Sequence, residues 1–487
     1  MSDPTTPHLY RLPRNARRIV AAGLDLRQLI ILCIGGSVFA GFTMTGSPFG
    51  VVLGAMLLVI AAVLTFVKFQ GQRLHAWAPR LAGFALQRAR NQHVYEALPG
   101  SGGFTEHVEL PGALYGVSVS AVIAGEHTTR PIEVDGSGPI GVITDKGGRD
   151  STSYTIVIEV ASPAVLLADV ATRNGYAAAW QDLLDRVGRH DSSIAQLGIV
   201  EITAPDAARC NWFASNYAAI ESDDAGRSEA SWHYRAMLAT ASNEPVHRMF
   251  VTVTVTDRSS RQSRRSIGGT ATDVLISEGH EIVAALRRME IVVVGWLSPE
   301  GIGRLIRGSY DPDEHLSTLP TDPNMIGPMG ARNGWSYYVH DNSVSCTLWV
   351  AQLPSDLVEC TLLAELMLLQ GVNRRVSFAY RPVPTELARR QIRSQRAADE
   401  DPRTDEADPT RRLQATDTAR FAQDLAAGAT AHRAACYVSV TASTIDELNA
   451  HVGELRRTAA AMGISLQVAY GTQDTAFSWT LPIGRGV

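Results

Sequence analysis

The motifs that could bind phosphate are incomplete in this chain. A Walker A loop needs Gly-Lys-Ser/Thr, because the lysine ammonium contacts the terminal phosphates of a nucleotide. The chain has only two lysines, Lys68 and Lys146, and Lys146 lies in the sequence Asp145-Lys146-Gly147. Nucleotide hydrolysis at a Walker-type site is therefore excluded.

A glycine-rich stretch at Gly136–Gly141 (GSGPIG) formally matches the dinucleotide-binding pattern GxGxxG. That pattern binds a pyrophosphate only when a helix follows it, since the N-terminal amides of the helix face the phosphates. Here Val142-Ile143-Thr144 follows, which is typical of a strand. We interpret the stretch as a hairpin turn.

Two short motifs contain the residue types of metal sites and catalytic triads. His280-Glu281 begins an HExx pair, but position 284 is alanine and supplies no second ligand, so a solvated helix face is favoured. His190-Asp191-Ser192-Ser193 has three triad residue types in succession, whereas triads draw their members from separate segments. We interpret this motif as a helix C-terminus followed by a turn.

Arginine-rich stretches occur at Arg258–Arg265 and Arg389–Arg396. Nucleic-acid contact favours a basic face with interleaved aromatics, and both stretches lack aromatic residues. We expect solvated or partner-facing arginines and no direct nucleic-acid binding.

Core or rim packing is the simplest interpretation of Trp180, Trp212, Trp232 and Trp335. No residue qualifies as catalytic, cofactor-binding or metal-ligating, and we predict a protein that is not an enzyme and needs no cofactor.

The cysteines favour a reducing compartment. Their number is odd, no CxxC occurs, and the closest two are fourteen residues apart: Cys33, Cys210, Cys346, Cys360 and Cys436. This spacing argues against a disulfide framework and against a zinc site.

The most informative segment is the uncharged stretch Gln28–Val67, which is bracketed by Arg27 and Lys68. One helix of that length would be about 60 Å long, twice the thickness of the hydrocarbon core of a bilayer. We therefore predict two transmembrane spans, Gln28–Met44 and Phe49–Val67, joined by a turn at 45–48. The alternative is a buried helical hairpin in a soluble core, which the missing polar stripe disfavours.

The flanks of this hairpin predict its orientation. Ten Lys/Arg and two Asp precede residue 96, which gives +8, so the rest of the chain carries −5 − 8 = −13. Basic flanks are retained in the cytoplasm, and we predict a plasma (inner) membrane protein with two spans and both termini cytoplasmic. A signal peptide is disfavoured, because a second span follows the first. The amphipathic run Leu74–Ala89, with Trp77, is expected either along the lipid interface or as an ordinary linking helix.

The remaining chain alternates strand and helix patterns, which favours cytoplasmic α+β (α/β-like) domains. A helix at 445–462 between strands at 434–441 and 465–470 suits a ferredoxin-like βαβ unit at the end. The predicted parts are a basic N-terminus (1–27), the hairpin (28–67), a basic helix and joint (68–104), a first domain (105–309), a linker (310–333), and a second domain (334–487) whose charged insert (397–416) is expected to be disordered or a solvated arm.

Several motifs resemble a known family. The basic N-terminus and hairpin resemble the small PrgI-like component of type IV secretion systems. Nearly the whole chain is similar to actinobacterial two-span membrane proteins encoded with conjugation-type secretion genes. The motifs that carry this likeness are Gly71–Pro79 (GQRLHAWAP), Leu297-Ser298-Pro299, Arg307 with Tyr310-Asp311-Pro312, Tyr380-Arg381-Pro382, and the ending Ala476-Phe477, Leu481-Pro482 and Arg485-Gly486.

The soluble part is similar in layout to the N-terminal region of the VirB-type secretion ATPase, and it stops where the Walker domain of that protein would begin. The turn-rich 130–151 and the charged 399–412 depart from the family pattern. The resemblance carries no catalytic residue over to this chain.

The resemblance implies an inner-membrane scaffold of a type IV-like conjugative secretion machine. Its expected partners are the lipid bilayer, a separate secretion ATPase or other membrane components, and copies of itself. An EccE-type membrane component of a type VII secretion system is the alternative in the same class. A membrane-tethered enzyme with an unrecognised site is the alternative of another class, and it would need acid, base and nucleophile on loops at strand ends.

Overall fold

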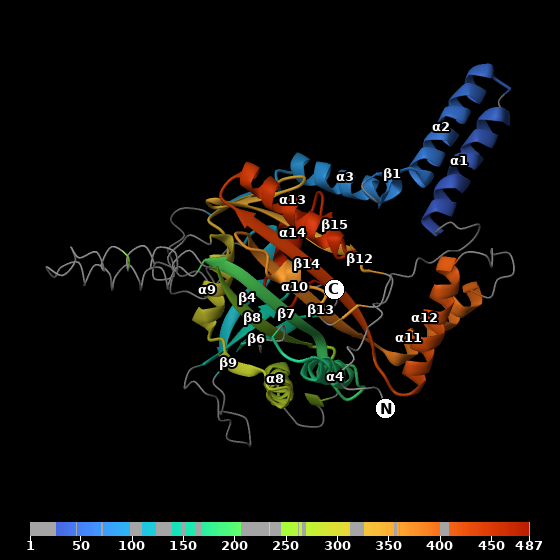
Figure 1. Cartoon of the computed structure of the whole chain (residues 1–487). Coiled ribbons are helices and arrows are strands. Elements are labelled where there is room, and N and C mark those ends of the chain that lie inside the picture. The colour runs from blue at the N-terminus through green and yellow to red at the C-terminus, as the bar shows by residue number, and fades with distance from the viewer. Residues whose placement is uncertain are drawn as a thin grey trace.

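The structure is a computed structural model of the whole chain (Figure 1). It describes residues 26–44, 46–69, 72–97, 110–122, 139–147, 151–161, 167–205, 233, 245–261, 263–264, 269–311, 326–354, 358–359, 361–399 and 409–486.

Two apolar helices, α1 (Leu26–Met44) and α2 (Pro48–Phe66), form a pair that stands away from the rest of the molecule (Figure 1). Small residues let the two backbones approach closely. A Cβ added at Gly35 would lie 2.8 Å from the Ala61 Cβ, and one at Gly54 would lie 3.1 Å from the Phe42 Cβ. The Gln28 amide donates to the Thr65 carbonyl at 2.9 Å across the base of the pair.

The prediction of two membrane spans is wrong on this structure. Within the described residues, α2 is the single helix that is long and apolar enough to cross a bilayer. The apolar part of α1, Gln28–Met44, is shorter, because Arg27 precedes it and the turn at Gly46 follows it. The predicted localisation, with two spans and both termini on one side, therefore loses its basis.

A short connection joins α2 to the body of the molecule. Strands β1 (Lys68–Phe69) and β2 (Gln72–Arg73) pair with each other, and α3 (Leu74–Ala89) follows at once. The helix has the bounds that its amphipathic pattern predicts. Trp77 is buried on its inner face, although Pro79 lies in its first turns.

The body is organised around one sheet of thirteen strands in which every pairing is antiparallel. The path β3-β10-β11-β12-β14-β13-β7-β8-β6-β5-β4 runs across it, with β15 paired to β12 and β9 paired to β6. The strands are β3 (Val94–Glu96), β4 (Val117–Val122), β5 (Ile140–Asp145), β6 (Ser153–Ala161), β7 (Ile194–Pro205), β8 (Pro245–Thr256), β9 (Val292–Trp296), β10 (Gly330–Asn333), β11 (Tyr338–His340), β12 (Ser343–Gln352), β13 (Asn373–Val383), β14 (Ala431–Ala442) and β15 (Ser465–Val468).

This sheet contradicts the predicted fold class of a two-span hairpin followed by small α/β-like domains. Strands from both predicted domains belong to the same sheet, since β7 pairs with β13 from Leu197↔Tyr380 to Thr203↔Arg374. The strands β14 and β15, on either side of α13 (Ile445–Ala461), both pair with β12 and are part of the large sheet. Periodicity predicts that a segment is a strand, but it does not predict the partner of that strand.

Helices cover both faces of the sheet. On β6, Ile156, Ile158 and Val160 face a core formed with α4 (Val170–Val187) and α8 (Ala271–Arg288). Val157, between them, faces a second core formed with α9 (Pro299–Tyr310) and α14 (Gln473–Ser478). A third core joins α13 and α10 (Ala364–Met367) to strands β12 to β15. A 3-10 turn, Gly112–Leu114, precedes β4.

The helix starts follow local capping chemistry. Thr270 and Asp273 form a capping box at the start of α8, and the Ser298 hydroxyl accepts from the Gly301 amide at 3.1 Å before Pro299 begins α9. These side chains satisfy backbone amides that lack partners within the helix. A serine N-cap followed by proline at the first helical position is a typical helix start, and α9 has both.

The charged insert, predicted to be disordered or a solvated arm, is helical in its described parts. Helix α11 (Thr385–Asp399) follows β13, and α12 (Pro409–Ala426) precedes β14. Helix therefore begins well before residue 416, and the rest of the insert, 400–408, lies outside the described residues. No glycine or proline occurs between residues 410 and 427, so the helical pattern near Phe421 extends back toward Pro409.

Candidate functional site

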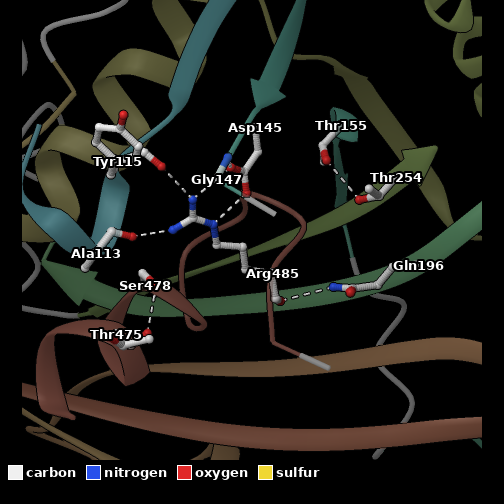
Figure 2. A network of polar contacts seen from close by, with 10 residues as sticks. All are labelled: Ala113, Tyr115, Asp145, Gly147, Thr155, Gln196, Thr254, Thr475, Ser478 and Arg485. Atoms are coloured by element: carbon white, nitrogen blue, oxygen red, sulfur yellow. Dashed lines mark hydrogen bonds and ion pairs between the residues drawn. The ribbon is translucent and has the colours of Figure 1, made fainter. Parts of the chain in front are cut away.

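The segment that follows α14 lies between strands that are far apart in the sequence (Figure 2). Arg485 is its main polar anchor. The guanidinium donates to both carboxylate oxygens of Asp145, at 2.7 and 2.9 Å, and to the carbonyls of Ala113 and Tyr115. This geometry is the bidentate pairing that arginine makes with a carboxylate, so it fixes the direction of the segment as well as its position.

The backbone of the same segment is held by two other strands. Gln196 on β7 donates to the Arg485 carbonyl at 3.1 Å, and the Tyr437 hydroxyl on β14 donates to the Gly486 carbonyl at 2.8 Å. Gly484 has φ +75°, and a Cβ there would lie 2.4 Å from the hydroxyls of both Thr155 and Thr254. A side chain at position 484 would therefore displace the segment.

A cluster of buried rings lies under this segment. Tyr310, Tyr338, His340 and Phe477 pack with their ring centroids 4.9 to 6.5 Å apart. The guanidinium of Arg375 lies 4.4 Å from the Phe477 ring centroid, a cation–π arrangement. We call these five residues the ring cluster.

A chain of hydrogen bonds runs through the ring cluster from Arg375 to the Tyr310 carbonyl. The Arg375 guanidinium donates to the Thr441 hydroxyl at 3.1 Å, and the hydroxyls of Thr441 and Ser345 lie 2.7 Å apart. The Ser345 hydroxyl is 2.7 Å from His340 Nε2, and His340 Nδ1 is 2.5 Å from the Tyr310 carbonyl. A carbonyl only accepts, so Nδ1 carries the proton and Nε2 accepts from Ser345.

Burial sets the charge of these groups. It lowers the pKa of His340 to about 3 and that of Arg375 to about 10, and it raises the pKa of Tyr310. Burial also raises the pKa of Tyr338, so at neutral pH the cluster contains a neutral imidazole, two neutral phenols and one cation. His340 and Tyr310 are fully buried, so the arrangement positions strands and offers no surface to a substrate.

A second polar group lies where β7 and β8 meet. Glu201 Oε1 accepts from the Thr203 hydroxyl at 2.5 Å and lies 2.9 Å from His247 Nδ1, while the Thr203 hydroxyl is 3.0 Å from the same nitrogen. In a triad the histidine uses one ring nitrogen for the acid and the other for the nucleophile. Here both partners share Nδ1, so Thr203 is not activated as a nucleophile.

The His280-Glu281 motif lies on α8, where Glu281 is exposed as expected for a solvated helix face but His280 is half-buried. The His280 imidazole lies 4.8 Å from the Trp296 ring centroid, with Nδ1 2.7 Å from the Ile276 carbonyl. Glu281 faces Arg186 at 3.3 Å. Groups of three or more metal-ligating side chains are absent from the described part of the chain.

The stretch His190–Ser193 lies between the end of α4 and the start of β7, as predicted. The Ser193 amide donates to Glu278 at 2.7 Å, its hydroxyl lies 2.5 Å from that of Ser263, and its carbonyl accepts from Ser259 at 2.6 Å. Burial raises the pKa of Glu278. The bond to Glu278 attaches the turn to α8, and the bonds to Ser259 and Ser263 attach it to the segment after β8. Neither His190 nor Asp191 enters these bonds.

The glycine-rich stretch leads into β5, so a strand follows it and not a helix. Positions 136–138 lie outside the described residues. Lys146 is exposed just after β5, and its amide donates to the Gly116 carbonyl at 2.9 Å. In the part of the chain that the structure describes, neither the glycine-rich stretch nor Lys146 contributes to a phosphate-binding loop.

The predicted positions of the tryptophans are tested at two of four sites. Trp180 is half-buried with its ring centroid 6.0 Å from that of Tyr380, and Trp335 stacks between Trp77, Phe84 and Tyr470. Trp212 and Trp232 lie outside the described residues.

Comparison with models of known protein families and with curated proteins finds no match for this chain.

Some residues of the motifs singled out in the sequence lie in the centre of the fold. Tyr310 and Phe477 belong to the ring cluster, Arg485 holds Asp145, and Arg307 donates to Asp341. Asp341 in turn accepts from the amides of residues 329 and 330 at 2.7 and 3.0 Å. Sequence reasoning found Arg307 and Arg485 only as family motifs. It missed Asp145, Asp341 and Arg375, because their significance depends on pairing between distant strands.

Proposed function

We propose that the protein is a non-enzymatic, membrane-associated scaffold of a type IV-like conjugative secretion machine that docks a separate ATPase. The resemblance of its motifs to that family suggests the machine. The observation that carries the scaffold role is the packed connection from α2 through α3 to the large sheet.

Helix α2 supports membrane association. It has nineteen residues, which at 1.5 Å per residue corresponds to about 28 Å, close to the thickness of a hydrocarbon core. Large apolar side chains on it are exposed, among them Phe49, Val52 and Val59 at 76%, 68% and 61%. Only 22% of its most apolar window is buried, which is unlike a helix in a soluble core.

The connection to the sheet is aromatic. Trp77 on α3 packs against Trp335 and Tyr470, with centroids 6.1 and 5.1 Å apart, and Phe84 meets Trp335 edge-on at 5.3 Å. Buried aromatic pairs are worth about 0.5–1.5 kcal/mol each beyond the area they bury. Because α3 follows α2 after only a short turn, these rings couple the position of α2 to that of the sheet.

The outer face of α3 fits a lipid surface. Leu81 and Leu86 are about half exposed, and Arg88 and Arg90 are exposed near the helix end. An amphipathic helix with leucines and arginines together lies at a bilayer interface, where arginines meet anionic headgroups. Trp77 faces the body, so the lipid-facing residues of α3 are its leucines.

Purification of the tagged full-length protein from its own cells tests this proposal. We expect it to sediment with membranes, to need detergent for extraction, and to co-purify with a VirB-type or FtsK-type ATPase. The matched variant replaces Val52 and Val59 with aspartate, and we expect it to leave the membrane fraction.

Recovery of the wild type in the aqueous fraction, or as a monomer without an ATPase under mild detergent, would overturn the proposal. The type of ATPase recovered, together with the neighbouring genes, separates a type IV-like machine from the type VII alternative.

A further inference from the structure

The helices α11 and α12 form an arm that stands out from the sheet (Figure 1). Strands β13 and β14 pair from Asn373↔Thr441 to Val383↔Ala431, but β7 pairs with β13 only as far as Tyr380. The last residues of the ribbon therefore extend beyond the neighbouring strand and support the two helices.

The arm has a small core of its own. Ala388 and Ile392 of α11, Leu425 of α12 and Ala431 of β14 are buried together, with Val383 and Ala422 packed against them. The ribbon is attached to the body near Thr430, whose amide and hydroxyl donate to Asp185 on α4 at 2.8 and 2.9 Å. The arm is thus a fixed projection with separate packing.

A shallow groove runs between the two helices of the arm, and we call it the arm groove. Its floor is aliphatic and its wall on the α11 side is basic; it is lined by Arg389, Ile392, Arg393, Ala422, Leu425 and Ala426. Both arginines are exposed, and none of the described residues that line the groove carries a carboxylate. Leu387 and Phe421 of the same arm are 49% and 42% exposed.

The arginines recur with helical spacing. Arg389, Arg393 and Arg396 are four and three residues apart, which places them along one side of α11. An aliphatic floor beside a line of cations is complementary to a helix with apolar residues on one face and carboxylates along its edge. The lining offers no aromatic side chain on which nucleobases could stack.

We propose that the arm groove docks an amphipathic helix of a partner protein, whose acidic side chains pair with Arg389 and Arg393. The apolar face of that helix covers Ile392 and Leu425, and the charges fix its direction. This inference does not depend on membrane association or on a secretion machine.

Designed peptides provide the probe. The test peptide is a labelled amphipathic helix with leucines at i, i+3, i+4 and i+7 and glutamates beside them. A second peptide has lysine in place of every glutamate, and a third has the test composition scrambled so that no apolar face forms. Binding to the purified full chain is measured by fluorescence anisotropy at low and at high salt, with a duplex DNA oligonucleotide in parallel.

The variant Arg389→Glu/Arg393→Glu reverses the charge of the groove. Its matched control, Arg287→Glu/Arg288→Glu, makes the same charge change at exposed positions at the end of α8. We expect the glutamate peptide to bind the wild type and the control equally, and the groove variant about tenfold more weakly or worse, since each reversed pair replaces attraction with repulsion. We also expect the lysine peptide to prefer the groove variant.

Three results would overturn the proposal: equal binding of the glutamate and scrambled peptides, equal loss of binding in the groove variant and its control, or binding of DNA that only the groove variant loses. Each variant is checked for an unchanged circular dichroism spectrum. A failure here leaves the fractionation and ATPase results untouched, so the two proposals are tested separately.

Discussion

At the scale of single residues, the buried charges have structural roles. Asp145 and Arg485 are 9% and 20% exposed at their side chains, so their pairing takes place largely out of water. Arg375 is buried with the Phe477 ring and neutral oxygens around it. Buried charges persist only with such compensation, because removal of one partner leaves the other desolvated and unpaired.

Replacing Arg485 with alanine is expected to lower the free energy of unfolding by about 3 kcal/mol, because Asp145 then remains buried without its cation. Arg485→Lys should restore part of this stability, since an ammonium can bind one carboxylate oxygen but cannot donate to all the acceptors of the guanidinium at once. Urea unfolding under one fixed buffer condition measures both, with Arg288→Ala as the exposed control. A loss no larger than that of the control would show that the ion pair contributes nothing.

His340 predicts a pH dependence of stability. Its pKa is about 3 in the folded protein against 6.5 for an imidazole in water, so the unfolded chain takes up the proton first as the pH falls. The unfolding free energy should therefore decrease by about 1.4 kcal/mol per pH unit between pH 6.5 and the folded pKa. Above pH 6.5 this group should leave the unfolding free energy unchanged.

His340→Gln removes this titration, and the glutamine amide still offers one donor group and one acceptor group in place of the imidazole. The variant is expected to be less stable than the wild type at about pH 7.5, and the difference should shrink by about 1.4 kcal/mol at about pH 5.5. An unchanged difference between the two pH values would contradict a buried neutral imidazole.

At the scale of elements, α3 connects two parts of different character. One of its faces is fixed by the rings of Trp77 and Phe84, and the other exposes Leu81 and Leu86. The local sequence is sufficient to form an amphipathic helix, but the direction that each face takes depends on Trp335 and Tyr470, which are contributed by later segments.

The variant Trp77→Ala is expected to release α3 from the body. Deleting a buried tryptophan costs about 3–5 kcal/mol, which falls mainly on this contact. Trypsin should then cleave after Arg80, Arg88 or Arg90 much faster than in the wild type, while the urea midpoint of the sheet changes little. The matched control Leu81→Ala should leave cleavage slow. Equal cleavage of both variants would argue against an aromatic attachment.

At the scale of the whole molecule, the continuous sheet and the C-terminal segment join parts that the sequence suggests are separate. The pairing of β7 with β13 is internal to the sheet, and the ring cluster combines α9, β11, β13 and α14. Phe477 contacts Tyr310, Tyr338, His340 and Arg375 from a position far along the chain. Such a fold should open as one cooperative unit.

Phe477→Ala tests that cooperativity. We expect native-state hydrogen exchange to show β6 and β8 losing protection together with β12 and β14, with the opening free energy of each lowered by a similar amount, about 3–5 kcal/mol. Val438→Ala, in the third core, is the comparison from one side of the sheet. Loss of protection confined to β12 and β14 in the Phe477 variant would show two independent units.

The local features of this protein follow from the residues of each segment. The apolar composition of α2, the bounds of α3, the caps at Ser298 and Thr270, and the missing Walker lysine follow from neighbours within a few residues. The sheet order, the pairing of Asp145 with Arg485 and the direction faced by Trp77 depend on the tertiary structure. Helix and strand patterns repeat over a few residues, so they report local geometry. Strand partners and buried ion pairs depend on contacts between segments hundreds of residues apart, which the same local patterns permit in many arrangements.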